Sequence, residues 1–344
     1  MQKNMISTLA TPRTAIKKLT QLNKEEQSHF VELFNTQSFI VTEKIDGMAL
    51  RLFFDNGKML FESAYSGLVE KDDFTFSEIS NKLYKKCTIK NIFEYPIKLV
   101  GELVYNAGID IENNIETFAP VCTKYSPSSA DDGSYFVIFN MFKVENNNLI
   151  QISDEEYNKI MNKILHTSNT SDVVQYIDGR KLTYDFSDID TDTFDALKNA
   201  FEYKVDSLKS NLCYDNVNSP IEGIVITFKN GEQFGVFSSK YKEIKNQYYE
   251  YLKEAEHIEN MFKKRVYGYC KRYSIINYKT YLSDDAKRKY DYYKDITIDN
   301  LKLTFYSIKH DKLLPFSCKY FQLNRVLNIM NKILTNDEIT YIIG

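Results

Sequence analysis

The sequence predicts an α+β body of antiparallel sheets with helices, followed by an all-helical C-terminal domain. Through most of the first 240 residues, apolar and polar residues alternate and the runs end in turn residues, which is typical of antiparallel strands. Beyond residue 240, Lys, Glu and Tyr dominate and apolar residues recur at helical spacing. A chain of 344 residues, 43% of them hydrophobic, is long enough for both parts. We expect domain 1–240 and domain 241–344.

The strands of the first part are defined by alternation and by two Asn-Gly turns. Asn56-Gly57 and Asn230-Gly231 each lie between two alternating runs, and Asn-Gly supplies the positive φ angles of a tight hairpin. Two hairpins are therefore expected. The predicted strands are 39–44, 48–54, 58–65, 97–105, 134–144, 219–228 and 232–239.

Helices are expected where the apolar period changes. Residues 153–166 begin with the capping-box pattern of Ser153 and Glu156 and continue with apolar residues at helical spacing. A second helix is expected over 191–210. From Lys240 onward the chain reads as helical, and no internal repeat is visible.

The net charge of -3 conceals an asymmetry along the chain. Residues 240–344 hold 20 Lys and Arg against 13 Asp and Glu, whereas residues 1–239 hold 24 against 34. An acidic body with a basic helical tail favours a polyanionic partner, although basic helices are also common as plain solvated faces.

Cysteine and histidine usage excludes several classes of site. The five cysteines are scattered and never form a CxxC pair, so neither a disulfide framework nor a zinc site is indicated. The four histidines are equally dispersed, which argues against a histidine triad. No apolar run is long enough for a signal peptide or a membrane span, and we expect a cytoplasmic protein.

The stretch VTEKIDGMAL at 41–50 carries the most informative chemistry. It places Lys44 between two carboxylates, Glu43 and Asp46, with Gly47 directly after. An amine attacks phosphorus only as the free base, which a partly desolvated site or nearby cations favour, and a glycine lets a substrate approach the backbone. Lys44 is thus either a nucleophile or an ordinary charged residue at the end of a strand.

Three further patterns follow Lys44-Ile45-Asp46-Gly47 on predicted strands. In chain order they are Gly101-Glu102, the aromatic pair Phe136 and Phe139, and Glu222-Gly223-Ile224-Val225. With these four patterns in this order, the sequence resembles the covalent nucleotidyltransferase superfamily of ATP-dependent polynucleotide ligases and mRNA capping enzymes over about residues 38–240. It most resembles the RNA ligases that lack an OB domain and end in helices. The resemblance implies an ATP-grasp-like ligase fold for the body.

The resemblance implies a role for each of these residues. Lys44 would form a phosphoramide bond to the nucleotide, and Glu222 would bind Mg²⁺, with Mn²⁺ as an alternative ion. Phe139 or its neighbour Phe136 would stack on the base of ATP, unless both fill the core. The remaining nucleotide contacts would come from Glu43, Asp46, Gly47 and Glu102, with the carboxylates of Asp46 and Glu102 at the ribose or near the metal.

The sequence departs from the family pattern at two places. The strand after Glu222-Gly223 normally carries two lysines that grip the α-phosphate, but those positions hold Gly235 and Phe237. Lys240 and Lys242 follow closely and could replace these lysines as nucleotide contacts after a bulge or register shift, and Lys229 lies at the far end of the preceding strand. In the hairpin after Lys44, a basic residue normally precedes a glycine; here Tyr65-Ser66 precedes Gly67, with hydroxyl donors but no charge.

The resemblance thus implies an ATP-dependent RNA ligase that joins 5′-phosphate and 3′-hydroxyl ends through a lysyl-AMP intermediate, an RNA-repair activity. The basic tail mixes Lys and Arg with Tyr at 263–273 and 286–294, which suits phosphate contacts and stacking on unpaired bases. The alternatives are a DNA ligase or another nucleotidyltransferase, and a nucleic-acid-binding relative with lost or weak catalysis.

Overall fold

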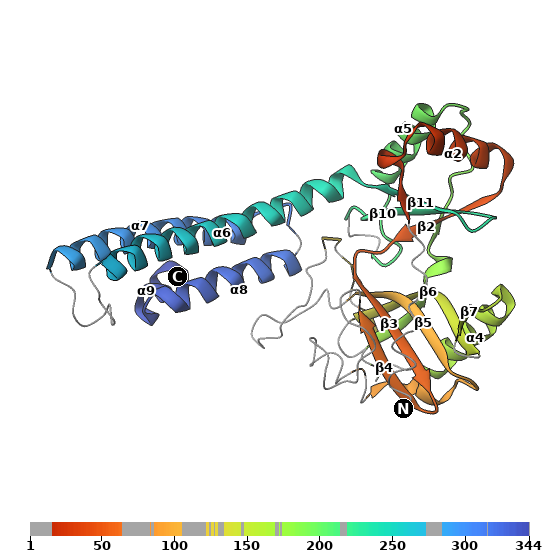
Figure 1. Ribbon diagram of the computed structural model, residues 1–344, viewed down its shortest axis with the longest axis horizontal. Helices are drawn as coiled ribbons and strands as arrows, with labels where there is room; N and C mark the ends of the chain where they lie inside the picture. Colours follow the sequence, from red (N-terminus) through yellow and green to blue (C-terminus); the bar gives the residue numbers. More distant parts are fainter. Residues whose placement is uncertain are drawn as a thin grey trace. The chain divides into compact units, whose positions relative to one another are not determined.

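The fold comes from a computed structural model, which divides the chain into two compact units, Met1–Lys242 and Glu243–Gly344 (Figure 1). Each is described by itself below. Within the helices, the side chains of residues 259, 262–272, 284–287, 289–290, 293, 316–317, 320–321 and 332–333 lie outside the description. The structure describes residues 16–63, 83, 86–104, 122–123, 125–126, 128–129, 134–145, 148–168, 172, 174–213, 219–272, 284–314 and 316–343.

The first unit contains a five-stranded sheet, sheet A. Its order is β1-β11-β10-β2-β9, with β1 parallel to β11 and the other pairs antiparallel. The turn between β10 and β11 contains Gly231 at φ 87°, as the Asn-Gly pattern predicts. The strands are β1 (Lys17–Lys18), β2 (Phe39–Lys44), β9 (Thr183–Tyr184), β10 (Gly223–Phe228) and β11 (Gln233–Phe237).

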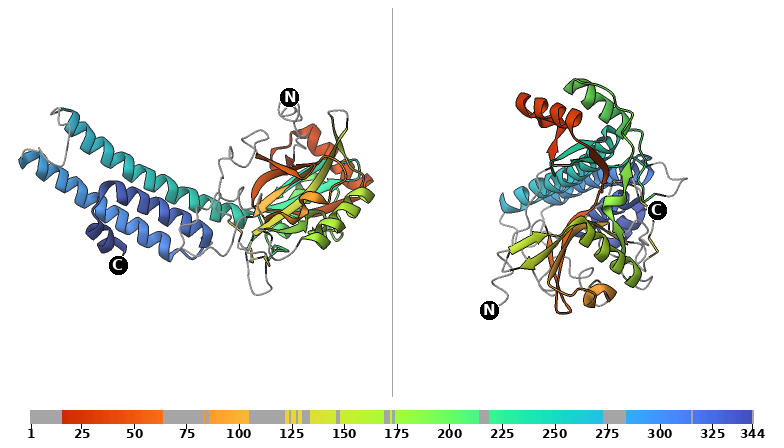
Figure 2. Two further views of the ribbon diagram at one scale, coloured as in Figure 1. Left: turned by 90° about the horizontal axis from the view of Figure 1, so that it is seen from below. Right: turned by 90° about the vertical axis from the view of Figure 1, so that its right-hand side faces the viewer.

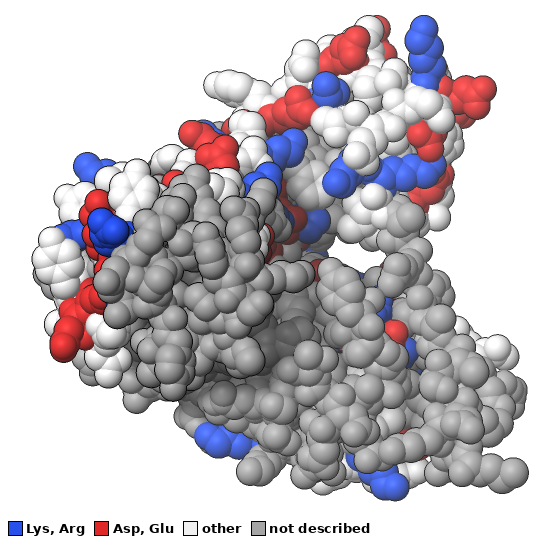
Figure 3. Space-filling model, turned by 60° about the vertical axis from the view of Figure 1, so that its left-hand side comes forward, with Lys and Arg blue, Asp and Glu red and all other residues white. Residues whose placement is uncertain are grey.

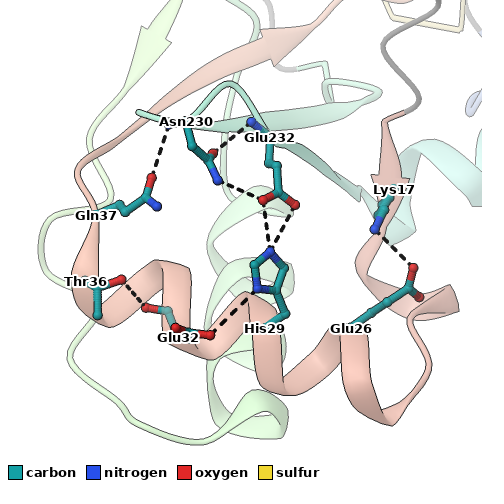
Figure 4. Close-up of polar contacts among 8 residues, drawn as sticks. All are labelled: Lys17, Glu26, His29, Glu32, Thr36, Gln37, Asn230 and Glu232. Carbon is teal, nitrogen blue, oxygen red and sulfur yellow. Dashed lines mark hydrogen bonds and ion pairs between the residues drawn. The ribbon is translucent and has the colours of Figure 1, made fainter.

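Two helices cover one face of sheet A. The helices α2 (Lys24–Thr36) and α5 (Phe194–Val205) lie above this sheet in Figure 1. Phe30 of α2 and Phe201 of α5 pack into a core with residues of β10 and β11, because alternate strand positions there are apolar. His29 of α2 also lies 2.9 Å from Glu232 in the β10–β11 turn, so the helix is tied to the sheet (Figure 4).

The opposite face of sheet A is called the Lys44 face. Residues that pair directly across neighbouring strands point to the same side of a sheet. Register therefore fixes which side chains share this face with the lysine. They are Lys18 of β1, Ile40, Thr42 and Lys44 of β2, Thr183 of β9, Gly223, Val225 and Thr227 of β10, and Gln233, Gly235 and Phe237 of β11.

The second sheet of this unit, sheet B, has six strands. Its path is β4-β3-β5-β6-β7, and β8 pairs in parallel with β6. The predicted hairpin of β3 and β4 is confirmed, with Asn56 and Gly57 at φ 47° and 75°. The strands are β3 (Met48–Asp55), β4 (Lys58–Ser63), β5 (Ile97–Val104), β6 (Ser134–Glu145), β7 (Asn148–Gln151) and β8 (Val174–Asp178).

Helix α4 (Asp154–Thr167) covers one face of sheet B and confirms the helix predicted there. Only half of the expected capping box forms: the Ser153 hydroxyl accepts a hydrogen bond from the Glu156 backbone amide, but the Glu156 carboxylate accepts from the hydroxyl of Tyr95. Three short 3₁₀ helices complete the described part of this unit: η1 (Leu19–Gln21), η3 (Thr88–Asn91) and η5 (Gly179–Lys181).

The second unit is helical, as predicted. Its helices lie side by side in Figures 1 and 2 and enclose a core that includes Ala255, Leu301, Val326 and Ile339. Helix α6 begins at the end of the first unit and continues into the second. The helices are α6 (Ser239–Arg272), α7 (Asp284–His310), α8 (Phe316–Ile333) and α9 (Asn336–Ile343).

The observed architecture confirms the predicted α+β class. The helix expected at 191–210 is shorter, at 194–205, and the structure adds α2, β1, β7, β8 and β9, which the sequence patterns did not indicate. The hydroxyl positions Tyr65 and Ser66 and the glycine Gly67 lie outside the described residues. The assignment of adenylyl transfer to domain 1–240 stays a prediction.

Candidate active site

Lys44 lies where the chain leaves sheet A for sheet B. It is the last residue of β2, and β3 of sheet B begins only four residues later at Met48. Its Nζ atom donates a hydrogen bond to Oε2 of Glu222 at 2.7 Å. Glu222 immediately precedes β10, whose first residue, Gly223, pairs with Lys44. Two segments distant in sequence are thus brought together by the register of one strand pair.

The glycine after the lysine is required by packing against sheet B. A Cβ atom at Gly47 would lie 2.9 Å from the carbonyl oxygen of Leu103 in β5, closer than a real Cβ approaches a backbone atom. Gly47 therefore lets the linking segment pass tightly over β5. This brings Glu102 of β5 near the lysine.

Asp46 is held by the protein on both of its carboxylate oxygens. The backbone amides of Cys122 and Thr123 donate to Oδ2, the second at 3.1 Å, and the Tyr241 hydroxyl donates to Oδ1 at 2.8 Å. Burial raises the pKa of Tyr241 far above its usual range, so the hydroxyl stays a donor. Asp46 thus ties the segment after Lys44 to the first turn of α6.

Glu102 faces the same cluster with one oxygen unused. Its buried Oε2 atom has no hydrogen-bond partner among the described residues. Burial raises its pKa to about 7; the charge of Lys44 opposes this shift, and the carboxylates of Glu222 and Asp46 add to it. A buried carboxylate with a free oxygen beside other carboxylates suits a cation.

The carboxylates do not form a complete metal cage by themselves. In the described part of the chain, no three His, Cys, Asp or Glu side chains are grouped closely enough to hold an ion. Mg²⁺ in nucleotide enzymes commonly uses one or two carboxylates and completes its shell with phosphate oxygens and water. Glu102 and Glu222 fit that pattern.

Glu43 points away from the Lys44 face. It is 0% exposed, and its Oε2 accepts hydrogen bonds from the Tyr184 hydroxyl at 2.9 Å and the Asn211 amide at 2.8 Å. Burial raises the pKa of its carboxyl group. Its bonds join β2 to β9 and to the segment around Asn211, so a contact to a base stays a prediction.

The two predicted aromatic residues occupy different faces of sheet B. Phe136 is 1% exposed and lies in the core under α4. Phe139 is half-buried and packs against the hydrophobic cluster that contains Ile45 and Val137, and Val137 shares its face of the sheet with Glu102. Phe136 is therefore not accessible to a base in this structure, and the stacking role stays a prediction for Phe139 alone.

A β-bulge sets the position of Phe139. Gly101 pairs with Ile138 and Val100 with Asn140, so Phe139 is the extra residue between two regular pairs. Bulges re-aim a side chain and are common beside active sites. A Cβ atom at Gly179 would lie 2.5 Å from the Phe139 ring, so a glycine is needed there.

An arginine that the sequence analysis missed braces this bulge. Arg180 donates from Nε to the carbonyl oxygen of Phe139 at 3.0 Å and from Nη1 to Asp154 at 2.7 Å. Its guanidinium lies 3.8 Å from the centre of the Tyr157 ring. The Tyr157 hydroxyl in turn donates to the carbonyl oxygen of Ile138 at 2.9 Å, so both residues at the bulge are held.

The lysines near the start of α6 flank a buried side chain. Tyr241 is 2% exposed and reaches Asp46, whereas Lys240 and Lys242 on either side of it are exposed. Neither ammonium group has a hydrogen bond or ion pair to a described residue. Lys229 lies past the end of β10 opposite to Gly223, away from Lys44.

The structure describes part of the basic tail. The side chains of 263–272 lie outside the description, as do most of those at 286–290. On the face shown in Figure 3, the described Lys and Arg side chains are interspersed with Asp and Glu. A nucleic-acid contact there stays a prediction.

Lys44, Glu102 and Glu222 all lie within one segment that matches a known protein family. The profile of the RNA ligase family matches residues 37–242, more than half of the chain. The chain belongs to the RNA ligase family. The segment that this RNA ligase family member shares with its relatives contains every predicted site residue, from Glu43 to Lys242. Both sheets of the first unit contribute to it.

Solved structures similar to this RNA ligase family member include variants of Naegleria gruberi RNA ligase. An apo variant is 14% identical with a TM-score of 0.44, covering 69% of this chain and 58% of its own. A variant with AMP and Mn is 15% identical with a TM-score of 0.44, covering 68% and 57%. One with ATP and Mn is 16% identical with a TM-score of 0.42, covering 68% and 58%.

The present chain therefore spans less than two thirds of the length of those Naegleria ligases. No curated protein sequence matches it significantly. Among its described helices, none combines the length and the apolar character that a membrane crossing requires.

Proposed function

We propose that this RNA ligase family member is an ATP-dependent RNA ligase whose nucleophile is Lys44. The observation that carries the proposal is the contact of the Lys44 ammonium with Glu222 at the junction of the two sheets, with Glu102 and Asp46 beside it. Phosphoryl transfer depends mainly on positioning and charge neutralisation. A lysine set among carboxylates, one of them with an unused oxygen, supplies both a nucleophile and ligands for a cation.

The first step forms a bond between Nζ of Lys44 and the α-phosphorus of ATP. The ammonium first loses a proton to solvent, and the free amine attacks. The bond from the α-phosphorus to its bridging oxygen breaks, the electron pair stays on that oxygen, and pyrophosphate leaves. A second proton passes from nitrogen to solvent, which leaves AMP joined to Lys44 as a phosphoramidate.

A divalent cation fits the donors beside the lysine. Glu102 and Glu222 would hold Mg²⁺ or Mn²⁺, because Oε2 of Glu102 is buried without a partner and hard cations prefer carboxylate oxygen. The ion would neutralise charge on the phosphates. Asp46 has a different role in this proposal: it positions the segment after Lys44, since its oxygens already accept protein donors.

The adenine is assigned to the face of sheet B that carries Phe139. The half-buried ring offers an aromatic surface and packs against the cluster that includes Ile45, the residue after the nucleophile. The bulge and the Arg180 contacts hold it in place. We assign these contacts to domain 1–240.

The later steps act on RNA. AMP moves from Lys44 to the 5′-phosphate of one RNA end, and the 3′-hydroxyl of another displaces it to form the phosphodiester bond. We assign contacts to the RNA backbone to the basic helical domain, 241–344, on the basis of its charge.

The test incubates the purified chain with α-labelled ATP and Mg²⁺. Nicked or single-stranded RNA, matched DNA, or hybrids of the two are then added in separate reactions. We expect label on the protein, transfer of AMP to the RNA end and sealed RNA product, all of them lost in Lys44→Ala. Joining of DNA in preference to RNA would contradict the substrate assignment. A folded protein that binds RNA but takes no label would instead be a binding relative without catalysis.

A further inference from the structure

A short strand at the edge of sheet A brings two lysines next to β11. Lys17 of β1 pairs with Phe234 and Lys18 with Gly235. Gly235 is one of the two positions where the family pattern places a lysine and this chain has none. The neighbouring backbone thus carries a lysine at the position where β11 lacks one.

The two lysines of β1 point to opposite faces of the sheet, since side chains alternate along a strand. Nζ of Lys17 lies 3.1 Å from Glu26 of α2, on the face that packs against the helices (Figure 4). Glu26 also completes a capping box with Asn23 at the start of α2, so this anchor is itself held. Lys18 is left on the Lys44 face.

The Lys18 ammonium lies near that of Lys44. Nζ of Lys18 is 5.0 Å from the centre of the Phe237 ring, and Nζ of Lys44 is 5.5 Å from the same centre. Each cation is favoured by the electron-rich face of the ring. The ring therefore holds both lysines within reach of one extended anion.

The negative charges around Lys44 favour a second cation at this site. Asp46, Glu102 and Glu222 are all acidic, and the phosphate chain of ATP is strongly anionic. Among the strand residues of the Lys44 face, only Lys18 and Lys44 are cationic. Lys18 is exposed, and within the described part of the chain no carboxylate pairs with it.

Packing also disfavours a side chain at Gly235. A Cβ atom at Gly235 would lie 2.9 Å from Cγ2 of Ile16, the residue before β1. A lysine at Gly235 would push against the segment that leads into β1. The segment whose Ile16 side chain crowds Gly235 thus continues into β1, which places Lys18 opposite Gly235.

We propose that Lys18 binds the two phosphates of ATP that leave as pyrophosphate. This rests on the proposed attack of Lys44 at the α-phosphorus. Lys44 must reach the α-phosphorus. The Phe237 ring separates the two lysines along the sheet. The Lys18 ammonium therefore contacts the β- and γ-phosphates, which extend beyond the α-phosphorus. As the bond from the α-phosphorus breaks, negative charge grows on the departing oxygen, and a fixed ammonium nearby stabilises it.

The test compares Lys18→Ala and Lys18→Arg with wild type and with Lys229→Ala, which removes an exposed lysine at the opposite end of sheet A. Calorimetry in Mg²⁺ measures the dissociation constants of ATP, pyrophosphate and AMP, and a labelling assay measures the rate of Lys44 adenylation. Far-UV circular dichroism and thermal unfolding show whether each variant folds.

Lys18→Ala is expected to raise the dissociation constants of ATP and pyrophosphate by about tenfold or more and that of AMP by less than about twofold, since a charge-assisted contact to the outer phosphates is lost. Adenylation slows at saturating ATP. Lys18→Arg keeps most of the affinity, and Lys229→Ala matches wild type. An equal loss for AMP, or a Lys18→Ala variant that matches Lys229→Ala, would overturn the proposal.

The binding measurements separate this proposal from the proposed function. If Lys44 of the wild type is labelled and Lys18→Ala binds ATP and pyrophosphate normally, only the role of Lys18 is refuted. If the wild type binds ATP in a way that depends on Lys18 but forms no lysyl-AMP, the ligase function is refuted and the phosphate site is supported. Wild type that binds neither ATP nor pyrophosphate overturns both.

Discussion

The hydroxyl of Tyr241 donates a hydrogen bond of 2.8 Å to the carboxylate of Asp46, two residues after Lys44. Tyr241 lies in the first turn of α6, and Asp46 lies in the segment that joins the two sheets. The position of the nucleophile therefore depends on where α6 begins. This contact is buried, so its loss would leave a buried carboxylate oxygen with fewer donors.

Tyr241→Phe is expected to lower the free energy of unfolding by about 1–3 kcal/mol and to slow adenylation of Lys44, because Asp46 loses a donor. Tyr251→Phe is the matched control: its hydroxyl donates to Asp311 at 2.9 Å in the helical unit. It should cost stability without slowing adenylation. Urea unfolding and the labelling rate measure the two effects. Equal adenylation in both variants would contradict a positioning role for Tyr241.

Glu102 should make stability depend on pH. Its pKa rises from 4.5 to about 7 in the folded chain, because burial disfavours the charged form. Between these values the folded chain binds more protons than the unfolded one, so this group lowers the free energy of unfolding as pH rises from about 4.5 to 7, by up to about 3 kcal/mol.

Glu102→Gln removes that titration. In metal-free buffer, the variant should gain stability relative to wild type between pH 5 and pH 8, as measured by urea unfolding at both values. A stability difference that does not change with pH would show that Glu102 is ionised throughout. With Mg²⁺ added, wild type should recover stability at pH 8, whereas the variant should recover less.

The two phenylalanines of β6 should separate binding from stability. Phe136→Ala removes a ring from the core and is expected to cost about 3–5 kcal/mol of unfolding free energy. Phe139→Ala should cost less stability but weaken ATP binding, because the half-buried ring faces the Glu102 side of sheet B. Urea unfolding and calorimetry distinguish them. Normal ATP affinity in Phe139→Ala would exclude the stacking role.

Arg180→Ala should act on nucleotide binding through Phe139. The guanidinium bonds to the Phe139 carbonyl and to Asp154 would be lost, and the bulge would be less fixed. We expect weaker ATP binding with a smaller change in pyrophosphate binding. Lys181→Ala removes the neighbouring, exposed positive charge and is the control. Equal effects of the two substitutions would indicate a general charge effect.

The regular parts of the fold could be predicted because their signals are local. Alternation and Asn-Gly turns indicate the strands on either side of Asn56-Gly57 and Asn230-Gly231, and the structure confirms both hairpins. The capping box of α2 was also readable at Asn23 and Glu26, although it was missed. The half-formed cap at Ser153 shows the limit of such signals, since Tyr95 competes for Glu156.

The parts that could not be predicted depend on contacts between distant segments. A strand of two residues, such as β1, is too short to show alternation, so nothing in the sequence places Lys18 beside Gly235. The bulge at Phe139 is set by pairing with β5 and by the Arg180 contacts. The burial of Glu43 likewise depends on Asn211, far along the chain.

The first measurement is a peptide map of the chain after incubation with ATP and Mg²⁺, read by mass spectrometry. We expect AMP on the peptide that contains Lys44, no AMP in Lys44→Ala, and release of the adduct when pyrophosphate is added. AMP on a different residue, an adduct that persists in Lys44→Ala, or a folded protein without any adduct would contradict Lys44 as the nucleophile.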